Sequence, residues 1–396
     1  MTVNLTSTSK TLTEHALDVV FSRLRAGELE VIWRDGGVGR FTGPRPGPSA
    51  RIELHDPKAA SRLLRSQAIG MAEGYMAGDW DTPDLDAVLD FGLANLVVKP
   101  VGLPRLLNPA IRAYHAMRDN SVAGSKRNIA QHYDLGNDFY ELWLDDSMAY
   151  SSALFEQPDE SLTPAQVHKW DRLLDLLQPG RDDHILEIGC GWGGFAIHAA
   201  QQSGCRVTGI TLSEEQHAWA TDAVRRAGVE DRVDVRLQDY RRVPGGFSAI
   251  ASIEMFEAVG CRWWPVFFDR LRELVRAGGA VALQTITIDD ARFDSYRREP
   301  DFIQRYVFPG GMLPSPERFR ESAEASGLKV GAEHFFGDSY ARTLSVWRER
   351  FEAVLPQVRA LGFDERFVRM WRYYLAYCRA GFDAGTVDVM QVRLDV

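Results

Sequence analysis

The sequence has few of the features that mark disulfide-stabilised, zinc-binding or membrane-spanning proteins. Its 396 residues include four cysteines, none of them in a C-x-x-C pair, which argues against a disulfide framework and a cysteine zinc site. It contains no run of 18 apolar residues, the length that a membrane-spanning helix requires. Residues 1–30 are polar and lack the apolar core of a signal peptide. We therefore expect a cytoplasmic protein without a metal site.

Positive charge is also in deficit, because 46 Lys and Arg stand against 55 Asp and Glu, for a net charge of -9. This balance argues against a general nucleic-acid partner. The composition is otherwise that of a globular protein, with 45% hydrophobic and 26% charged residues. The length allows two domains that each bury a core.

Residues 1–98 are predicted to form a small accessory α+β domain. "EHALDVVFSRLRAG" has the apolar spacing of a helix and ends on glycine, whereas "LEVIWRD" and "ARIELHD" alternate as strands do. "DPKAASRLLRSQAIGMAEGYMAGDW" follows as a second helix. We find no catalytic constellation in this part of the chain.

Residues 99–127 carry six basic residues and one acid, interspersed with apolar side chains. One interpretation is an amphipathic basic helix that lies on anionic lipid. The plainer alternative is a solvated linker helix between two domains. We treat the stretch as a basic linker and expect peripheral attachment to the inner face of the membrane.

From about residue 184 the chain alternates between strand-like and helical segments. The apolar runs "HILEIG", "RVTGITL", "RVDVRLQD", "FSAIASIEM" and "GGAVALQTI" predict a mostly parallel α/β sheet covered on both faces. "KVGAEHFFG" (329–337) and "TLSVWRERF" (343–351) are expected to close it as an antiparallel hairpin. An insertion rich in arginine and aromatic residues separates them from the fifth strand, at about 287–325.

The first strand leads into "EIGCGWGGFA" (187–196), in which Gly189, Gly191 and Gly194 satisfy G-x-G-x-x-G. This turn serves nicotinamide dinucleotides, and also S-adenosylmethionine (SAM). A dinucleotide site has an acidic residue about 20 positions later that binds the ribose, whereas this chain has Thr211 and Leu212 there. The nicotinamide alternative, an oxidoreductase, is therefore the weaker one.

Two carboxylates favour SAM. Glu187, at the end of the first strand, would repel a pyrophosphate but suits the cationic amino-acid end of SAM; alternatively, it caps the following turn. Asp239, after the third strand in "RLQDY", is placed to accept a hydrogen bond from an adenine amino group.

Several longer motifs make the match more specific, and together they resemble the cyclopropane fatty acid synthases, which include bacterial cyclopropane-fatty-acyl-phospholipid synthases and mycolic acid methyltransferases. The resemblance covers about 125–396, and "GMAEGYMAGDW" (70–80) looks like the extra domain of the phospholipid-acting branch. It implies a Rossmann-like SAM-methyltransferase domain over 128–396, with 287–325 as a lipid-binding insertion. The motifs are "HYDLGNDFYELWLDDSMAYSSALF" (132–155), "LEIGCGWGGFA" (186–196), "ITLSEEQ" (210–216), "SIEMFEAVG" (252–260) and "YCRAGFDAGTVDVMQV" (377–392).

The resemblance also implies site residues. SAM would contact Tyr150, Ser151, Gly189, Gly191, Thr211, Leu212, Gln216, Gln238 and Asp239. Family members hold a bicarbonate ion beside the reacting alkene, and its ligands correspond here to Ser152, Glu257, Gln284, Ile286 and Tyr340. The family has cysteine at the position of Ser152 and histidine at that of Gln284, which puts the bicarbonate in doubt.

These two departures bear on the product. An alkene that attacks the SAM methyl group becomes a carbocation, and early proton loss closes a cyclopropane ring. If the anion is lost or moved, a hydride shift can precede proton loss and leave a methylene branch. Glu257 would then be the base, together with Tyr340, Gln284 and Ser152 in the catalytic group. We expect the branched product, with cyclopropane formation as the alternative.

The expected partners are unsaturated phospholipid acyl chains at the membrane surface and a separate reductase that converts the methylene to a methyl branch. A homo-oligomer is also expected. A more distant alternative is a catalytically inactive module that binds lipid and SAM to regulate a partner. Retention of Glu257, Tyr340 and the glycine turn argues against this alternative.

Overall fold

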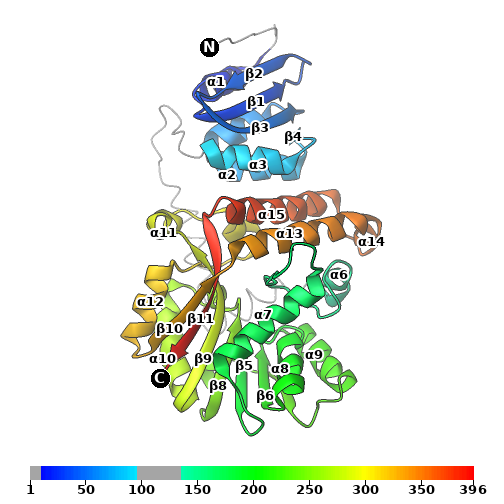
Figure 1. The fold of residues 1–396 in the computed structure, drawn as a ribbon. Coiled ribbons are helices and arrows are strands. Elements are labelled where there is room, and N and C mark those ends of the chain that lie inside the picture. Colours follow the sequence, from blue (N-terminus) through cyan, green and yellow to red (C-terminus); the bar gives the residue numbers. More distant parts are fainter. Residues whose placement is uncertain (1–9, 96–134) are drawn as a thin grey trace. The chain divides into compact units, whose positions relative to one another are not determined.

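The computed structural model describes residues 10–95 and 135–396, which separate into two compact units. The smaller unit holds residues 10–95 and Leu355–Ala384, and the larger unit holds residues 135–354 and Gly385–Val396. The basic stretch 99–127 lies outside the described residues, so its interpretation stays a prediction. The two units are drawn in Figure 1.

The smaller unit is an α+β fold, as expected for an accessory domain. Its sheet has the order β2-β1-β3-β4, in which β1 runs parallel to β3 and antiparallel to β2. Its elements are α1 (Leu12–Phe21), β1 (Ala26–Ile32), β2 (Val38–Thr42), β3 (Arg45–Leu54), α2 (Lys58–Ala77), β4 (Trp80–Asp81), α3 (Leu85–Asn95), α14 (Leu355–Ala360) and α15 (Glu365–Asp383).

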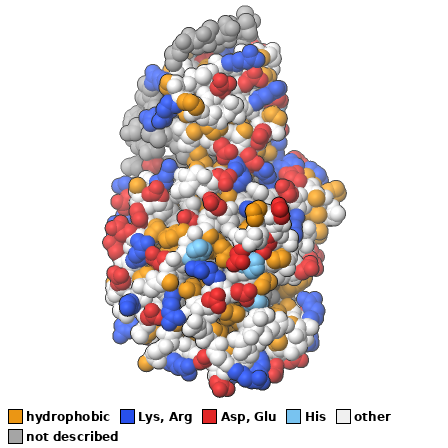
Figure 2. All heavy atoms as spheres, in the orientation of Figure 1, with side chains coloured by type: hydrophobic (Ala, Val, Ile, Leu, Met, Phe, Trp, Pro, Cys, Tyr) orange, Lys and Arg blue, Asp and Glu red, His pale blue; other side chains and the backbone are white. Residues whose placement is uncertain are grey.

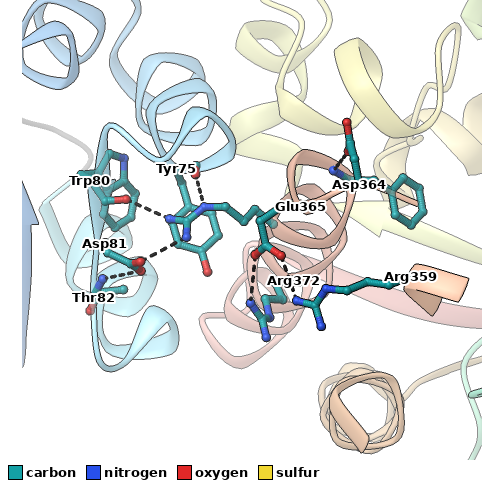
Figure 3. Close-up of polar contacts among 10 residues, drawn as sticks. Tyr75, Trp80, Asp81, Thr82, Arg359, Asp364, Glu365 and Arg372 are labelled. Carbon is teal, nitrogen blue, oxygen red and sulfur yellow. Dashed lines mark hydrogen bonds and ion pairs between the residues drawn. The ribbon is translucent and has the colours of Figure 1, made fainter. Parts of the chain in front are cut away.

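Helix α15 is joined to the N-terminal elements by a half-buried arginine, Arg369. The Arg369 guanidinium donates to the carbonyls of Tyr75 and Trp80, the latter at 2.9 Å, and to the Asp81 carboxylate at 3.1 Å. It also lies 4.0 Å from the centroid of the Tyr75 ring. Figure 3 shows Tyr75, Trp80 and Asp81 beside α15. The structure thus differs from the expected continuous 128–396 domain, because α14 and α15 pack with the N-terminal elements.

The larger unit is built on a seven-stranded sheet in the order β10-β11-β9-β8-β5-β6-β7, and β5 to β9 are mutually parallel. Its helices and strands are α6 (Asn137–Glu141), α7 (Leu162–Leu177), β5 (His184–Ile188), α8 (Gly194–Ser203), β6 (Arg206–Thr211), α9 (Glu214–Arg226), β7 (Val233–Leu237), η1 (Tyr240–Arg242), β8 (Phe247–Ile253), η2 (Phe256–Ala258), η3 (Cys261–Trp263), α10 (Trp264–Leu274), β9 (Val275–Ile288), α11 (Asp290–Tyr296), η4 (Ile303–Val307), α12 (Pro316–Ala325), β10 (Lys329–Phe335), α13 (Gly337–Ala353) and β11 (Val387–Asp395).

Helices cover both faces of this sheet, as the continuous apolar strands predict. Ile185 of β5 belongs to a core with Leu173 of α7 and Phe195 of α8. Its neighbour Leu186 belongs to a second core with Phe267 of α10 and Phe319 of α12. Successive side chains of a strand point to opposite faces, so β5 packs against both helical layers. The predicted mostly parallel α/β fold is confirmed.

One predicted strand is wrong. "TLSVWRERF" (343–351) lies within α13, and the strand that pairs with β10 is β11. Leu344, Trp347 and Phe351 are buried at spacings of three and four residues, which is the period of a helix. The β-branched and aromatic composition of this segment favours a strand locally, but its buried face follows the helical period.

The surface of the larger unit is of mixed charge. Figure 2 shows basic and acidic side chains interspersed over the visible face, with hydrophobic side chains gathered near its middle. Among the described helices, we find none both long enough and apolar enough to span a bilayer.

Candidate active site

Most of the predicted site residues lie at one edge of the larger sheet. Glu187 is the second-last residue of β5, Thr211 ends β6, Asp239 follows β7 and Glu254 follows β8. These four strands are parallel neighbours, so their carboxyl ends meet at the same edge. Chain order reverses between β5 and β8, and α/β proteins bind ligands at such a point.

The glycine turn leaves open space where the resemblance places SAM. Gly189 and Gly191 have φ of 83° and 53°, values that L side chains rarely adopt. A Cβ atom on Gly189 would come within 2.9 Å of the Met255 side chain, whereas nothing lies within 4 Å of one on Gly191. The backbone of Gly191 is therefore accessible to a ligand.

Glu187 fits the cationic end of SAM. Its side chain is 2% exposed, and Oε2 has no hydrogen-bond partner among the described residues. Burial raises the pKa of Glu187 to about 8, against the opposing effect of Lys169. An unpartnered carboxylate oxygen in this position favours a ligand with an ammonium group, since such a group would satisfy and ionise it.

The residues after β6 form a buried polar corner. The Thr211 hydroxyl donates to Oε1 of Gln216 at 2.8 Å, and both side chains are buried. Ser213 caps α9 by accepting from the Gln216 amide at 3.2 Å, which fixes that residue in the first turn of the helix. Leu212 is half-buried beside them. Their contact with SAM stays a prediction.

Asp239 has a local role that sequence reasoning missed. Its Oδ1 accepts from the amide and Nε of Arg241, both at 2.9 Å, and its Oδ2 pairs with Nη2 at 2.6 Å. The carboxylate therefore caps η1 and holds Arg241. Gln238 donates to the Arg242 carbonyl at 3.2 Å. The adenine contact of both residues stays a prediction.

The segment before α7 brings an aromatic cluster to the site. Tyr150 packs against Tyr140, Trp143 and Trp347, with ring centroids 5.2, 5.7 and 5.3 Å away, and Trp192 of the glycine turn packs on Tyr140 at 5.2 Å. The neighbouring Ser151 is buried, and its hydroxyl accepts from Lys169 Nζ at 2.7 Å. Aromatic faces attract cations, which suits a sulfonium or a carbocation.

Glu254 is the centre of the predicted anion site, although sequence analysis did not single it out. Its Oε1 accepts from the Ser152 amide and from Gln284 Nε2, both at 2.8 Å, and its Oε2 accepts from the Tyr340 hydroxyl at 2.7 Å. The loss of surrounding water raises the pKa of Glu254, while Lys169 and these donors oppose that rise. Ser152 takes part through its backbone, since its own hydroxyl donates to the Ala153 carbonyl.

Glu257, the base expected from the sequence, lies beside this group and not at its centre. Its Oε1 accepts from the Thr285 hydroxyl at 3.0 Å and from the Ile286 amide, and its Oε2 has no hydrogen-bond partner among the described residues. Loss of water, reinforced by the charge of Glu254, raises the pKa of Glu257 to about 8. This shift favours the protonated form of Glu257, which cannot accept a proton.

The donor set does not fit a bicarbonate ion. Three of its implied ligands, Ser152, Gln284 and Tyr340, already donate to Glu254, and Ile286 donates to Glu257. A further anion would have to displace a carboxylate of the chain or bind beside one against its charge. The carboxylate of Glu254 accepts from three of the residues that the resemblance assigns to the ion.

The backbone conformation of Glu254 distinguishes it as a candidate functional residue. Its φ of 49° lies in the left-handed region, where a non-glycine residue costs about 1–3 kcal/mol and is often functional. This conformation cannot be read from "SIEMFEAVG", in which Glu254 and Glu257 are equally visible. The sequence therefore offers both acids as candidates without ranking them.

Comparisons with known proteins agree with this geometry. The family model described as "Mycolic acid cyclopropane synthetase" matches residues 121–392. The tuberculostearic acid methyltransferase UfaA1 of Mycobacterium tuberculosis is 41% identical over 92% of this chain and 87% of its own length. The cyclopropane-fatty-acyl-phospholipid synthase of Escherichia coli is 34% identical over 87% of each chain.

Solved structures of SAM-dependent enzymes are also similar to this chain. The mycolic acid cyclopropane synthase CmaA1, crystallised with SAH and CTAB, is 31% identical and aligns with a TM-score of 0.64, covering 68% of this chain and 98% of its own. Coclaurine N-methyltransferase bound to SAH is 20% identical with a TM-score of 0.66, and this likeness supports the fold alone.

Proposed function

The chain belongs to the mycolic acid cyclopropane synthetase family, and from this premise we propose that it converts the cis double bond of an unsaturated phospholipid acyl chain into a methylene branch. Members of this family use SAM to transfer a methyl group or to form a cyclopropane on lipid acyl chains, and this chain is such a SAM-dependent enzyme. The observation that supports a methylene branch is the carboxylate of Glu254, which accepts from three donors where a free anion was expected.

SAM supplies an electrophilic methyl group when it is bound. The π electrons of the alkene form a bond to that methyl carbon, the bond from carbon to sulfur breaks, and its electron pair stays on sulfur. The second alkene carbon becomes a cation. Water must be kept out at this stage, and the packed rings of Tyr150, Trp347 and Tyr340 are our candidates for stabilising the positive charge.

Glu254 is the proton acceptor in this proposal. A 1,2-hydride shift moves the cation to the carbon that carries the new methyl group. Loss of a proton from that methyl group then leaves an exocyclic double bond, and Glu254 becomes a carboxylic acid. Three hydrogen bonds to the carboxylate weaken it as a base and fix its position, so deprotonation is slow enough for the hydride shift to come first.

The names of the relatives support parts of this proposal. One is named a tuberculostearic acid methyltransferase, which agrees with methyl transfer to a fatty acid. Another is named a cyclopropane-fatty-acyl-phospholipid synthase, which supports a phospholipid substrate and keeps ring closure as the second candidate. Both products share the first bond-forming step. A separate reductase would be needed to turn the methylene into a methyl branch.

The insertion is the proposed contact for lipid. It contains α11, η4 and α12, and its Met312 amide donates to the Glu257 carbonyl at 2.8 Å, which joins it to the site. Its exposed arginines, Arg292, Arg297 and Arg298, suit anionic head groups. Peripheral attachment to the inner face of the membrane, a cytoplasmic location and a homo-oligomer belong to this proposal.

Lipid analysis tests the proposed function. The chain should be produced in a bacterium that has oleoyl phospholipids and no enzyme of this family. Gas chromatography with mass detection should then reveal methylene-branched acyl chains, which react as alkenes when derivatised, whereas cyclopropanes do not. Cyclopropane as the sole product would refute the branching proposal and leave the family assignment intact.

A further inference from the structure

Lys169 is a buried cation for which the mechanism above has no use. It lies on α7, on the buried face that also carries Gln166, Trp170 and Leu173. Lys169 is 0% exposed, and no other lysine or arginine among the described residues is buried to this extent. A charge removed from water in this way is costly unless it is paired.

Its direct partners tie it to the segment that precedes α7. Nζ donates to the Ser151 hydroxyl at 2.7 Å and also to Oε1 of Gln166. The Lys169 backbone carbonyl accepts from Gln391 Nε2 at 3.1 Å, and the same amide group donates to Oε1 of Gln284 at 2.9 Å. Gln284 in turn donates to Glu254. Lys169 is thus built into the hydrogen-bond network of the site.

Three acidic groups from three segments act electrostatically on the ammonium. Glu254 follows β8, Asp145 precedes the Ser151 segment, and Glu187 is on β5; each interacts electrostatically with Lys169. Burial lowers the pKa of Lys169 to about 8, while these acids oppose the shift, so the ammonium form predominates at pH 7.

We propose that Lys169 is a positioning residue that keeps Glu254 ionised, and therefore able to accept the proton, while its bond to Ser151 holds the neighbouring segment in place. Of the two glutamates that act on the ammonium, Glu254 is better prepared than Glu187 to carry negative charge, because three donors surround its carboxylate. Lys169 and Glu254 then balance each other's charge, whereas burial raises the pKa of Glu187 and Glu257 and favours their protonated forms in the absence of a ligand. This inference rests on the proposed role of Glu254.

The pH dependence of turnover tests the inference. Without the ammonium the pKa of Glu254 rises further, since one of the effects that lower it is lost. In Lys169→Met, the acid limb of the kcat profile should therefore move to higher pH by about one unit or more. Leu173→Ala, one turn along the same buried face, should lower stability and leave the limb in place. An unshifted limb in a folded Lys169→Met protein would overturn the proposal.

A stability comparison supplies a readout that does not depend on turnover. Removing only the Lys169 ammonium leaves the buried Glu254 carboxylate without a compensating charge. Removing both charges does not. Lys169→Met combined with Glu254→Gln should therefore melt at a higher temperature than Lys169→Met alone. A double variant that melts lower, by the sum of the two single effects, would contradict the pairing.

The two proposals fail in different ways. Total modified acyl chain, ring and branch together, is the quantity to follow, so a cyclopropane product leaves the Lys169 test valid. Full turnover in Glu254→Gln would refute Glu254 as base, and the Lys169 inference with it. If the acid limb shifts in Lys169→Met and the product is a cyclopropane, the positioning role of Lys169 is supported and the branching proposal is refuted.

Discussion

The phenol of Tyr340 donates a 2.7 Å hydrogen bond to Oε2 of Glu254, although 86 positions separate the two residues in sequence. Tyr340 belongs to the first turn of α13, and Glu254 follows directly on β8. The bond therefore connects a helix outside the sheet with the edge where the parallel strands end. It is a hydrogen bond to a charged group when Glu254 is ionised, and such bonds are stronger than neutral ones.

Loss of this bond should reduce the fraction of Glu254 that is ionised. In Tyr340→Phe we expect kcat to fall roughly tenfold and the acid limb of the pH profile to rise, because one of the groups that lower the pKa of Glu254 is removed. SAM affinity, measured by calorimetry, should change little. Tyr373→Phe, a buried tyrosine of the smaller unit, is the matched control and should behave as the unmodified protein.

Exchanging the resident carboxylate for a diffusible one should change the product. Glu254→Gly removes the side chain and leaves the donors on Ser152, Gln284 and Tyr340 without their acceptor. We expect turnover to fall by a hundredfold or more and to recover in part with added bicarbonate or formate. The recovered product should contain more cyclopropane than that of the unmodified chain. If millimolar to molar concentrations of these anions do not restore turnover, the donors do not form an anion-binding site.

Glu257 should affect stability at high pH. Its pKa in the folded protein is about 8, above its ordinary value of 4.5. The folded state therefore binds more protons than the unfolded state between these values, so stability falls as pH rises from about 4.5 to 8. Glu257→Gln should make that fall shallower, whereas the exposed Glu349→Gln should not. Thermal melts at pH 5, 7 and 9 measure the slopes, and parallel slopes would contradict the raised pKa.

The glycine turn should be required for SAM. A valine at Gly191 places its side chain in the open space above the turn and strains a backbone with φ of 53°. Gly228 after α9 has φ of 66° and equally open surroundings, so Gly228→Val imposes the same strain away from the turn. Calorimetry should show SAM affinity lost in Gly191→Val and kept in Gly228→Val. Equal affinity in both would place SAM elsewhere.

Attachment to membranes should be electrostatic. Each basic side chain near an anionic surface contributes about 1 kcal/mol, and salt screens it. Co-sedimentation with vesicles should therefore increase with phosphatidylglycerol content and decrease with added salt. Arg292→Glu with Arg298→Glu should weaken it, whereas Arg225→Glu on α9 should not. Binding that ignores lipid charge and salt would rule out this mode of attachment.

The sequence predicted the features that local patterns determine. The apolar runs located β5 to β9, and the glycine spacing located the turn before α8, because each of these depends on neighbouring residues. The second closing strand was misplaced because β11 pairs with β9 and β10 across long stretches of chain. Glu254 was missed for a related reason. Its partners come from four separate segments, and the amino-acid sequence does not indicate its left-handed backbone conformation.

The assignment of α14 and α15 to the smaller unit has a consequence for how the chain folds during synthesis. Translation delivers β5 to β10 first, then both of these helices, and only then β11. Until β11 emerges, β9 keeps an unpaired edge and Gln284 lacks its partner Gln391. The catalytic sheet is therefore completed late, by pairing residues about 100 positions apart, and such non-local pairing is slow and prone to aggregation. A ribosome-bound chain that stops before β11 should accordingly require chaperones, and it lacks the hydrogen bond from Gln391 to the Lys169 carbonyl.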